Sequence, residues 1–313
     1  MVTQEPWAIS KILSIKDFDI ASILRILKVA DEMKEIVTKQ GSCQLLKGKI
    51  LANVFYEPST RTNCSFQAAM LRLGGAVIPV NESTSSAQKG EILGDTIRCL
   101  ECYADVIVLR HPERGSAAVA AAATSKPLIN AGDGIGEHPT QALLDLFTIY
   151  NELGTTDLAG KIVTMVGDLK NGRTVHSLAK LLALFKVKIY YISPDTLKMP
   201  REIIQSLNDS GIEQHESNDL EPVMNITDVL YVTRVQKERF ASAQEYEAVK
   251  NNFKITLLTI QNAKSSLIIM HPLPRVGEIA EEVDQDPRAA YFGQMKNGMY
   301  VRMALLALVL GVA

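Results

Sequence analysis

The sequence lacks the features that mark membrane and secreted proteins. No apolar run in its 313 residues is long enough to span a bilayer, and the most apolar stretch, 303–313, is too short. Residues 1–10 carry no basic region followed by an apolar one, so no secretory signal is expected. These absences favour a protein of the cytoplasm.

Cysteine is scarce, and the four cysteines are scattered along the chain. Cys99 and Cys102 form a single C-x-x-C pair, but no second pair or histidine cluster accompanies it, whereas a zinc site needs about four ligands. A metal or redox site is therefore disfavoured. We expect the thiols to be buried as small apolar side chains in a reducing compartment.

Charge asymmetry and nucleotide-binding motifs are also missing. The 33 basic and 35 acidic residues leave a net charge of −2 without a block of one sign, which argues against nucleic acid or an anionic membrane as a partner. Neither the Walker A sequence nor the G-x-G-x-x-G spacing occurs. Nucleotide hydrolysis and a generic dinucleotide-binding module are therefore disfavoured.

The sequence does contain a regular alternation of strand-like and helical segments. Strands separated by helices favour parallel sheets covered on both faces, and two such series predict two doubly wound α/β domains linked by helices. The break falls near the helix that Pro139 opens, which gives domains at 1–145, completed by a C-terminal helix at 288–313, and at 146–287. The expected strands are 50–55, 76–80, 105–109 and 127–131, then 162–166, 187–193, 229–232 and 267–270.

A cluster of hydroxyls and one guanidinium lies where the first strand gives way to a helix. Ser59, Thr60, Arg61 and Thr62 follow the strand at 50–55 and precede a helical pattern of apolar residues. The start of a helix leaves backbone N–H groups without partners and carries the positive end of the dipole, so it attracts anions. Hydroxyls donate and arginine binds bidentately, which together suit a phosphate. The alternative is a helix cap beside a solvated arginine.

Two further polar stretches follow strands of the first series. Arg110 comes after the third strand and can face an anion, or it can lie in an ordinary surface loop. After the fourth strand, a loop with three glycines would let the backbone approach a ligand closely. His138 and Gln141 then share one face of a helix, where they can polarise a carbonyl and orient an amine. A capping loop with a buried, hydrogen-bonded histidine is the alternative.

Polar residues also follow the strands of the second series. Arg173 begins a helix and can bind a carboxylate, and Arg234 belongs to a charged loop. Two prolines after His271 fix an extended loop whose carbonyls can accept hydrogen bonds from an amine. The alternatives are a solvated arginine, a solvated charge run and a rigid connecting turn. Lys89, in a polar loop of the first series, looks like an ordinary surface lysine.

Taken together, these motifs resemble the aspartate carbamoyltransferase family, above all its eukaryotic form, which is often one domain of a multifunctional pyrimidine-synthesis protein. The resemblance implies the carbamoyltransferase fold, with carbamoyl phosphate bound by the first domain and L-aspartate by the second. It implies carbamoyl transfer in de novo pyrimidine biosynthesis, no metal or organic cofactor, and a homotrimer with shared active sites. The matching stretches are 59–62, 85–91, 110–112, 138–141, 172–177, 234–239 and 271–275.

The resemblance also implies a role for each matching residue. Carbamoyl phosphate would be bound by Ser59, Thr60, Arg61, Thr62, Ser85, Lys89, Arg110, His138, Gln141, Pro272 and Leu273. Those that also assist catalysis would be Arg61, Thr62, Lys89, Arg110, His138 and Gln141. Aspartate would be bound by Lys89, Arg173, Thr174, Arg234, Gln236 and Leu273. Ser85 and Lys89 would come from a neighbouring subunit, and Glu57 would bridge Arg173 and Arg239 when the domains close.

Two alternatives to this assignment stay open. Ornithine carbamoyltransferases share the phosphate-binding signature, but they typically show His-Cys-Leu-Pro where residues 271–274 read His-Pro-Leu-Pro. Arg173 and Arg234 also suit a dianionic second substrate and would repel a cationic one. The other alternative is a catalytically silent carbamoyltransferase-like domain with a role in assembly or regulation, which would bind phosphate without turnover.

Four positions depart from the family pattern, and none of them is an implied ligand. Asn63 and Cys64 stand where relatives often carry other pairs, Gly94 is less usual than alanine, and Gly293 occupies a position that often holds Arg or Gln. A glycine inside a helix costs about 1 kcal/mol relative to alanine. These departures are expected to affect stability or regulation more than chemistry.

Overall fold

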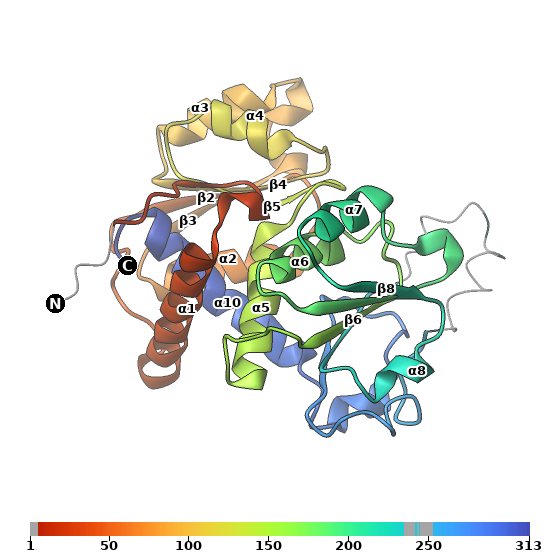
Figure 1. The fold of residues 1–313 in the computed structure, drawn as a ribbon. Coiled ribbons are helices and arrows are strands. Elements are labelled where there is room, and N and C mark those ends of the chain that lie inside the picture. Colours follow the sequence, from red (N-terminus) through yellow and green to blue (C-terminus); the bar gives the residue numbers. More distant parts are fainter. Residues whose placement is uncertain (1–5, 235–241, 243, 245–252) are drawn as a thin grey trace. The chain divides into compact units, whose positions relative to one another are not determined.

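The computed structural model describes residues 6–234, 242, 244 and 253–313. The chain folds into two compact units: the first comprises Met1–Phe147 with Lys296–Ala313, and the second comprises Thr148–Met295. Each contains one five-stranded parallel sheet with helices, so the predicted α/β class is confirmed (Figure 1). The expected domain boundaries at 145 and 288 stay a prediction.

The first unit is built on a sheet with the strand order β1-β5-β4-β2-β3, in which every pair is parallel. The sequence pattern predicted four of these strands to within two residues and missed β1, because two residues are too few to show a pattern. The strands are β1 (Lys11–Ile12), β2 (Ile50–Phe55), β3 (Ala76–Asn81), β4 (Val106–His111) and β5 (Leu128–Asp133).

Helices cover both faces of this first sheet. Figure 1 shows α3 and α4 on one face and α1, α2 and α10 on the other. Alternate residues of β2 and β4, such as Val54 and Leu109, pack with Ile97 of α3 and Ala120 of α4 in one buried cluster. The helices are α1 (Ile20–Gln40), α2 (Thr60–Arg72), α3 (Leu93–Glu101), α4 (Ser116–Ala122), α5 (Pro139–Leu153) and α10 (Tyr291–Val309).

The second unit has the strand order β10-β9-β6-β7-β8, again parallel throughout. The sequence pattern missed β8 because its four residues, Gln-His-Glu-Ser, are polar and lie at an edge where no apolar alternation is needed. The strands are β6 (Ile162–Val166), β7 (Lys188–Ile192), β8 (Gln214–Ser217), β9 (Val229–Val232) and β10 (Ile268–Met270).

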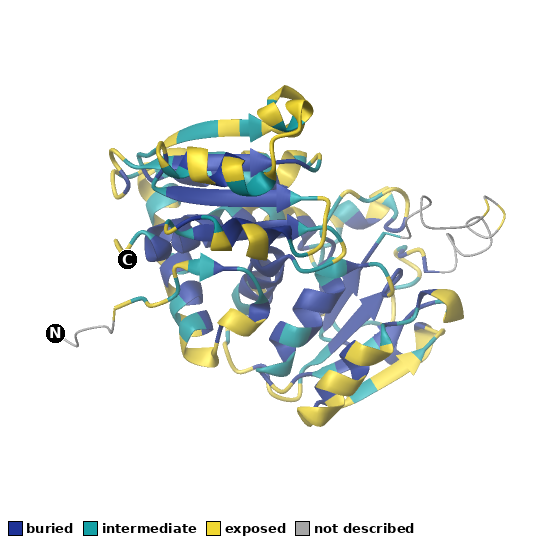
Figure 2. Cartoon of the chain, turned by 90° about the horizontal axis from the view of Figure 1, so that it is seen from above, coloured by how far each residue is buried: buried dark blue, intermediate teal, exposed yellow. Residues whose placement is uncertain are grey.

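Two amphipathic helices and one short helix flank the second sheet. Figure 1 shows α6 (Arg173–Ala183) and α7 (Arg201–Asp209) on one face and α8 (Glu221–Met224) on the other. The α8 face has its own core, in which Val223 and Met224 pack against Leu230 and Ile269 of the neighbouring strands. In each unit the inner strands of the sheet are deeply buried and drawn dark blue in Figure 2, whereas the edge strands β3 and β8 are partly exposed.

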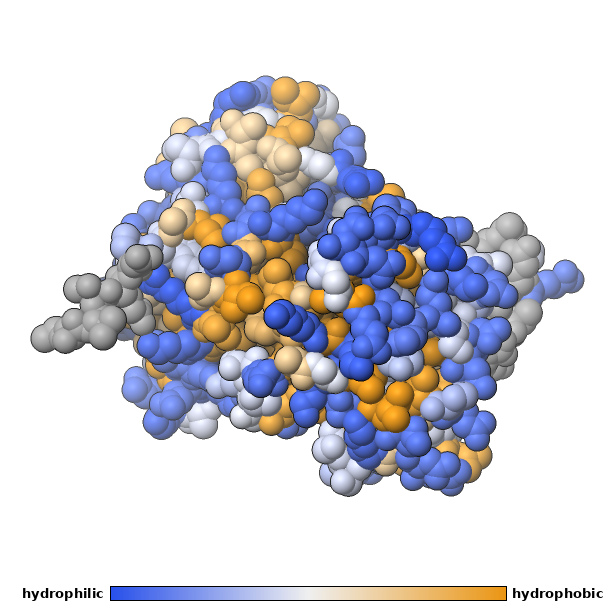
Figure 3. Space-filling model, viewed as in Figure 1, coloured by the Kyte–Doolittle hydropathy of each residue, from blue (hydrophilic) through white to orange (hydrophobic). Residues whose placement is uncertain are grey.

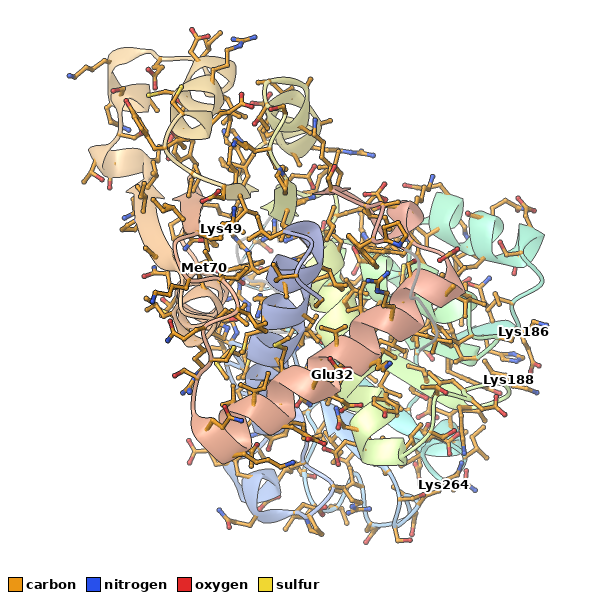
Figure 4. The ribbon with its side chains drawn as sticks, turned by 90° about the vertical axis from the view of Figure 1, so that its left-hand side faces the viewer. Glu32, Lys49, Met70, Lys186, Lys188 and Lys264 are labelled. Atoms are coloured by element: carbon orange, nitrogen blue, oxygen red, sulfur yellow. The ribbon has the colours of Figure 1, made fainter. Side chains whose placement is uncertain are left out.

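A lysine and an aspartate fasten the starts of the central strands in both units. Asp105, just before β4, accepts from the N–H of Ile50 at 2.8 Å and from Lys49 Nζ at 3.2 Å. Lys49 and its counterpart in the second unit, Lys264, are labelled in Figure 4. These charges lie at the starts of the strands. The polar residues predicted to bind a ligand lie at the opposite edge of the sheet, where the strands end.

Three of the four cysteines are exposed, which corrects the expectation that they are buried. Cys64, Cys99 and Cys102 are exposed, and Cys43 is half-buried. The reason for two of them is the orientation of α3, which buries Ile97 and Leu100 and turns Cys99, and Cys102 just after its end, outward. In the described part of the chain, no group of three or more His, Cys, Asp or Glu side chains is placed to hold a metal ion.

The face shown in Figure 3 is mostly hydrophilic, with pale, weakly apolar residues over α3 and α4 and further apolar patches elsewhere on the face. This follows from composition, because α4 reads Ser-Ala-Ala-Val-Ala-Ala-Ala and its Val119 is exposed. Among the helices of the described residues, none is both long enough and apolar enough to cross a membrane.

Candidate active site

The predicted turn between β2 and α2 is confirmed, and its hydroxyls do not serve as helix caps. Ser59 precedes the first residue of α2 in an extended conformation, φ −160° and ψ 99°, and its side chain makes no capping hydrogen bond among the described residues. The first N–H groups of α2 lack acceptors within the helix. Arg61 is exposed and Thr62 is buried beside them. A capping role for the Ser59 side chain is therefore wrong, and phosphate binding at this helix start stays a prediction.

Arg110 is buried at the end of β4, so the surface-loop alternative is wrong. Its Nη2 donates to Glu57 Oε1 at 2.6 Å, and its Nη1 donates to the carbonyl oxygen of Ala131 on β5 at 3.4 Å. The Arg110 guanidinium therefore lies at the carboxyl end of the sheet, which is where open parallel sheets bind their ligands. Glu57 and an anionic ligand would compete for the same guanidinium.

His138 and Gln141 are both buried at the start of α5. Thr140 Oγ1 lies 3.4 Å from His138 Nδ1, and Gln141 Nε2 donates to Asp145 Oδ1 at 2.8 Å. Pro139 begins the helix, as predicted, because its fixed φ suits the first turn. The two side chains therefore lie at the end of β5, beside the strand that carries Arg110.

Two glycines of the loop before α5, Gly134 and Gly136, pack closely within the first unit, and the expected approach of this loop to a ligand stays a prediction. A Cβ on Gly134 would lie 2.3 Å from the carbonyl oxygen of Pro112, and one on Gly136 would lie 2.5 Å from Asp133 Oδ1. The N–H of Gly134 also donates to the carbonyl oxygen of His111 at 2.9 Å. These contacts bind the loop after β5 to the loop after β4. Gly134 and Gly136 thus let these two loops, with their site residues, pack closely together.

In the second unit, Arg173 is the first residue of α6 and Thr174 is the second. Asp168 fixes the preceding loop by accepting from the N–H of Asn171 at 2.9 Å. A Cβ on Gly167 would lie 2.4 Å from the carbonyl oxygen of Thr233, so the loop after β6 packs closely on the end of β9.

The expected second arginine also lies at the end of β9. Arg234 is half-buried and follows that strand by two residues, so it emerges beside the loop that leads to Arg173. The second unit therefore presents two guanidinium-bearing positions at the ends of neighbouring strands. Gln236 and Arg239, which were also predicted to take part, lie outside the described residues.

His271 holds the loop that carries Pro272 and Leu273. Its Nδ1 accepts from the N–H of Leu273 at 2.8 Å, and its Nε2 lies 2.7 Å from Glu278 Oε1. Because Nδ1 must accept, the proton is on Nε2 and points at the carboxylate. Burial is the largest influence and would raise the pKa of Glu278, but the hydrogen bond and charge of His271, together with the backbone N–H groups of Val276 and Glu278, outweigh it and leave that pKa below its usual value. The loop is rigid, as the turn alternative proposed, and still leads two carbonyls past the end of β10.

Lys89 and Ser85 lie in the loop after β3, the edge strand of the first sheet. Lys89 is exposed, and the hydroxyl of Ser85 donates to the carbonyl oxygen of Glu82 at 3.0 Å. Their predicted contribution to a neighbouring subunit stays a prediction. Glu57 pairs with Arg110, and its predicted bridge to Arg173 and Arg239 also stays a prediction.

Sequence reasoning missed the buried polar groups behind the site. Asn53 in the middle of β2 donates to Asn63 Oδ1 at 2.9 Å, which ties the start of α2 to the sheet and gives one departure from the family pattern a structural role. Asp145 and Arg302 are likewise buried beneath the helix starts. A charged residue within an otherwise apolar helical run, as Arg302 is at 299–309, was the available signal.

The other three departures from the family pattern, Cys64, Gly94 and Gly293, do not disturb the packing of this structure. A Cβ on Gly94 would make ordinary contacts, the nearest 3.6 Å from Arg98 Nη1, and one on Gly293 would meet nothing within 4 Å. Cys64 is exposed on α2. Alanine would therefore fit at both glycine positions, and neither departure reaches a predicted ligand.

Comparison with known proteins gives the family. The carbamoyl-phosphate-binding domain of aspartate/ornithine carbamoyltransferases matches residues 10–151, and the aspartate/ornithine-binding domain of the same family matches residues 159–309. The chain is 58% identical to the multifunctional protein pyr1-3 of Dictyostelium discoideum over 96% of the chain but only 13% of that protein. It is 50% identical to the aspartate carbamoyltransferase catalytic subunit of Thermococcus onnurineus, over 98% of both chains.

Solved structures agree over nearly the whole chain. The aspartate transcarbamoylase of Trypanosoma cruzi, solved with carbamoyl aspartate and phosphate, superposes with a TM-score of 0.91 at 43% identity and covers 98% of each chain. The catalytic subunit of M. jannaschii aspartate transcarbamoylase gives a TM-score of 0.91 at 49% identity, covering 96% of this chain and 98% of that one. The resemblance found in the sequence is thereby confirmed, and the chain belongs to the aspartate/ornithine carbamoyltransferase family.

Proposed function

We propose that this chain transfers the carbamoyl group of carbamoyl phosphate to the amine of L-aspartate, giving N-carbamoyl-L-aspartate and phosphate in de novo pyrimidine biosynthesis. The observation that carries the proposal is the start of α2, where the donors of Thr60 to Thr62 are not used for capping and Arg110 lies at the end of the adjacent strand β4. Relatives solved with carbamoyl phosphate and aspartate support the same pair of substrates.

The first unit supplies the groups that handle carbamoyl phosphate. Ser59, Thr60, Arg61 and Thr62 bind the phosphate at the positive end of α2. Thr62, Arg110 and His138 polarise the carbamoyl carbonyl and stabilise the negative charge that develops on its oxygen as the amine attacks. Gln141, with the carbonyl groups of Pro272 and Leu273, orients the reacting amide and amine groups.

The second unit supplies the groups that recognise aspartate. Arg173 and Arg234 bind its two carboxylates, and Thr174 and Gln236 assist. Arginine suits this task because its planar fork matches a carboxylate and stays charged at any physiological pH. The pair also favours a dianionic amino acid over ornithine, whose side chain is cationic.

The chemistry requires orientation and charge stabilisation more than a dedicated side-chain base. The amine attacks in its deprotonated form, the bond to the phosphate oxygen breaks, and the departing phosphate accepts the proton. Holding the two substrates in line removes most of the entropic barrier, and a closed, drier site strengthens each electrostatic contact. We propose that Glu57, Arg173 and Arg239 take part in that closure.

The test is direct. The purified chain is incubated with carbamoyl phosphate and either L-aspartate or L-ornithine, and the ureido product is quantified. We expect product with aspartate alone. Product with ornithine alone would contradict the roles of Arg173 and Arg234. Carbamoyl phosphate binding without product from either amino acid would contradict catalysis and favour a silent domain.

We further propose a homotrimer in which Ser85 and Lys89 complete the site of a neighbouring subunit. The exposed position of Lys89 at the outer edge of the first sheet supports this arrangement. Mixing inactive Lys89→Ala chains with inactive Arg61→Ala chains should restore part of the activity, because some hybrid sites then contain both wild-type residues. Mixed trimers that form but stay inactive would contradict the shared site.

The chain spans about one-seventh of the length of the multifunctional relatives that it matches, 13% of one and 14% of another. We therefore propose other pyrimidine-pathway domains as its partners, and the cytoplasm as its location. Copurification of carbamoyl phosphate synthetase activity with this chain from its native source would test the first proposal. Cell fractionation would test the second.

A further inference from the structure

A buried carboxylate fixes the orientation of the Gln141 side chain. Gln141 Nε2 donates to Asp145 Oδ1 at 2.8 Å, one turn further along α5. Asp145 has 0% exposure and Gln141 only 6%. Because a carboxylate only accepts hydrogen bonds, the NH₂ end of the Gln141 amide must face Asp145. The carbonyl oxygen Oε1 therefore faces the other way and is available as an acceptor.

A buried guanidinium accompanies this carboxylate. Arg302 of α10 is 4% exposed, and its Nη1 donates to Ser65 Oγ on α2 at 2.6 Å. Its guanidinium lies over the ring of Phe66, 5.1 Å from the centroid. Burial lowers the pKa of Arg302 to about 9, and the carboxylate of Asp145 opposes that shift. A pKa of about 9 keeps the guanidinium charged at neutral pH.

The last helix is shaped around this guanidinium. A Cβ on Gly298 would lie 2.7 Å from Arg302 Nη1 and 3.0 Å from Leu144 Cδ2 of α5, so glycine provides the space in which the charge is buried. The Nε of Arg302 has no hydrogen-bond partner among the described residues. A buried charge with such an unsatisfied donor is a poor way to gain stability, since apolar residues of similar volume often do better. The arrangement therefore calls for a functional reason.

The positions of Arg302 and Asp145 between two helices of the site suggest that functional reason. Ser65 comes one turn after Thr62 on α2, and Asp145 comes one turn after Gln141 on α5. Arg302 therefore contacts α2, which begins at the proposed phosphate site, and it interacts electrostatically with Asp145 on α5, which begins beside His138 and Gln141. The hydrogen bond between Gln141 and Asp145 is therefore held by the charge near Asp145 and by the buried helix α5.

We propose that Asp145 is a positioning residue for the carbamoyl transfer, and that Arg302 stabilises its carboxylate in the ionised, acceptor-only form. In this form Asp145 keeps Gln141 Oε1 turned toward the NH₂ group of carbamoyl phosphate, which can only donate in the contact. An Asp145→Asn side chain could offer NH₂ to Gln141 and let its amide turn over, so that two donors would meet at the substrate. The proposal rests on the proposed role of Gln141.

The decisive experiment is a double-mutant cycle between Asp145→Asn and Gln141→Ala. We expect Asp145→Asn to lower kcat by about tenfold or more in the wild-type chain, because a misoriented amide loses its contact in the transition state. In the Gln141→Ala background the same substitution should change kcat by less than about twofold, since no amide remains to be oriented. Equal losses in both backgrounds, or no loss in the wild-type chain, would overturn the proposal.

A general loss of stability is controlled with a carboxylate of the second unit. Asp228 accepts from the N–H of Ile162 and from Lys264 Nζ, both at 2.8 Å, at the starts of the strands. We expect Asp228→Asn to lower the melting temperature while kcat stays within about twofold of the wild-type value. A kcat loss that followed the melting temperature in both variants would assign Asp145 a structural role only and overturn the proposal.

A second pair of variants keeps the proposal testable if Asp145→Asn does not fold. Arg302→Lys retains the positive charge near Asp145, whereas Arg302→Met removes it at similar volume. We expect the lysine variant to keep kcat within about threefold and the methionine variant to lose about tenfold. Equal activity of the two would show that the charge on residue 302 does not act through Asp145, which would contradict the proposal.

Failure of the proposed function would be recognised separately. If the wild-type chain makes no product from carbamoyl phosphate and either amino acid, the function itself is wrong. The Asp145 contact then still has its own readout, which is the exchange of the Gln141 side-chain NH₂ protons followed by NMR. Slow exchange in the wild-type chain and fast exchange in Asp145→Asn would support the positioning contact, and equal exchange in the two would overturn it.

Discussion

The two units use the same strand order and carry different chemistry on it. In the first, β2 lies between β3 and β4, with β5 beyond β4; in the second, β6 lies between β7 and β9, with β10 beyond β9. The fifth strand is added at different edges, β1 beside β5 and β8 beside β7. The common framework accounts for the fold, so the difference in function must come from what stands at the ends of the strands.

The starts of the strands are alike in the two units. Asp105 binds the N–H of Ile50 and the ammonium of Lys49, and Asp228 binds the N–H of Ile162 and the ammonium of Lys264. In each case a carboxylate just before one strand, β4 or β9, fastens the first residue of the neighbouring strand, β2 or β6. This edge therefore serves stability in both units.

The ends of the strands carry similar residues in the two units, with one main difference. An arginine lies in the first turn of the helix after the central strand, Arg61 or Arg173, and a second lies at the end of the neighbouring strand, Arg110 or Arg234. Only the first unit adds a row of hydroxyls at its helix start. A helix start with hydroxyls suits a tetrahedral anion, and guanidinium groups alone suit planar carboxylates.

The largest expected effect is the loss of the phosphate site in the first unit. Arg61→Ala should lower kcat/KM about a thousandfold, because a charged donor to the phosphate and the developing charge is removed. Steady-state kinetics with carbamoyl phosphate and aspartate measures it. Arg72→Ala is the matched control, since Arg72 lies on the same helix but at its far end, where it donates to the carbonyl oxygen of Gly41. An equal loss in both variants would contradict the assignment.

The counterpart in the second unit should affect the other substrate. Arg173→Ala should raise the KM for aspartate by about 10- to 100-fold, the cost of a charge-assisted hydrogen bond, and leave carbamoyl phosphate binding unchanged. Titration of each substrate at saturating levels of the other separates the two. Arg201 is the control, because it is also the first residue of a helix, α7, but pairs with Glu216 on the surface. A change in carbamoyl phosphate affinity for Arg173→Ala would contradict the proposal that each unit binds one substrate.

A smaller effect is expected at the loop after β10. His271→Asn keeps an acceptor near the Leu273 N–H and removes the donor to Glu278 Oε1, whereas His271→Gln keeps a donor near Glu278 and loses the Leu273 contact. We expect the glutamine variant to lose about tenfold in kcat and the asparagine variant to lose about 1–3 kcal/mol of stability with nearly normal kcat. Kinetics and denaturant unfolding of the two variants check this. The reverse order would show that the loop is not held through Leu273.

The smallest effects are expected at the strand starts. Asp105→Asn should lower the free energy of unfolding by about 1–3 kcal/mol and leave kcat unchanged. Burial raises the pKa of Asp105, but its bonds to Ile50 and Lys49 outweigh burial and hold it below the usual value. The stabilisation is therefore complete above the unfolded pKa of about 3.9 and is lost as the pH falls through the folded pKa.

Urea unfolding at several pH values measures this last effect. The wild-type chain should be more stable than Asp105→Asn at neutral pH, and the difference should shrink as the pH falls below about 4. A difference that stayed constant down to pH values well below that point would mean that the carboxylate charge contributes nothing. Asp228→Asn tests whether the same fastening stabilises the second unit to a similar degree.

Most of the fold could be predicted from the sequence because its signals are local. Apolar runs bounded by turns gave eight strands, and Pro139 and the residues after each strand marked the helix starts. The two strands that were missed, β1 and β8, are short or polar edge strands, whose pairing depends on a neighbour and not on their own pattern. The outward direction of Cys99 and Cys102 likewise depends on which face of α3 meets the sheet.

The sequence by itself determined the α/β class, the family and the residue types at the strand ends, because each of these is written in short stretches of neighbouring residues. Only the tertiary structure decided that Ser59 does not cap its helix, that Glu57 pairs with Arg110, and that Arg302, far along the chain, lies beside Ser65. The physical reason is that a buried charge takes its role from partners brought to it by folding, and no local pattern specifies those partners.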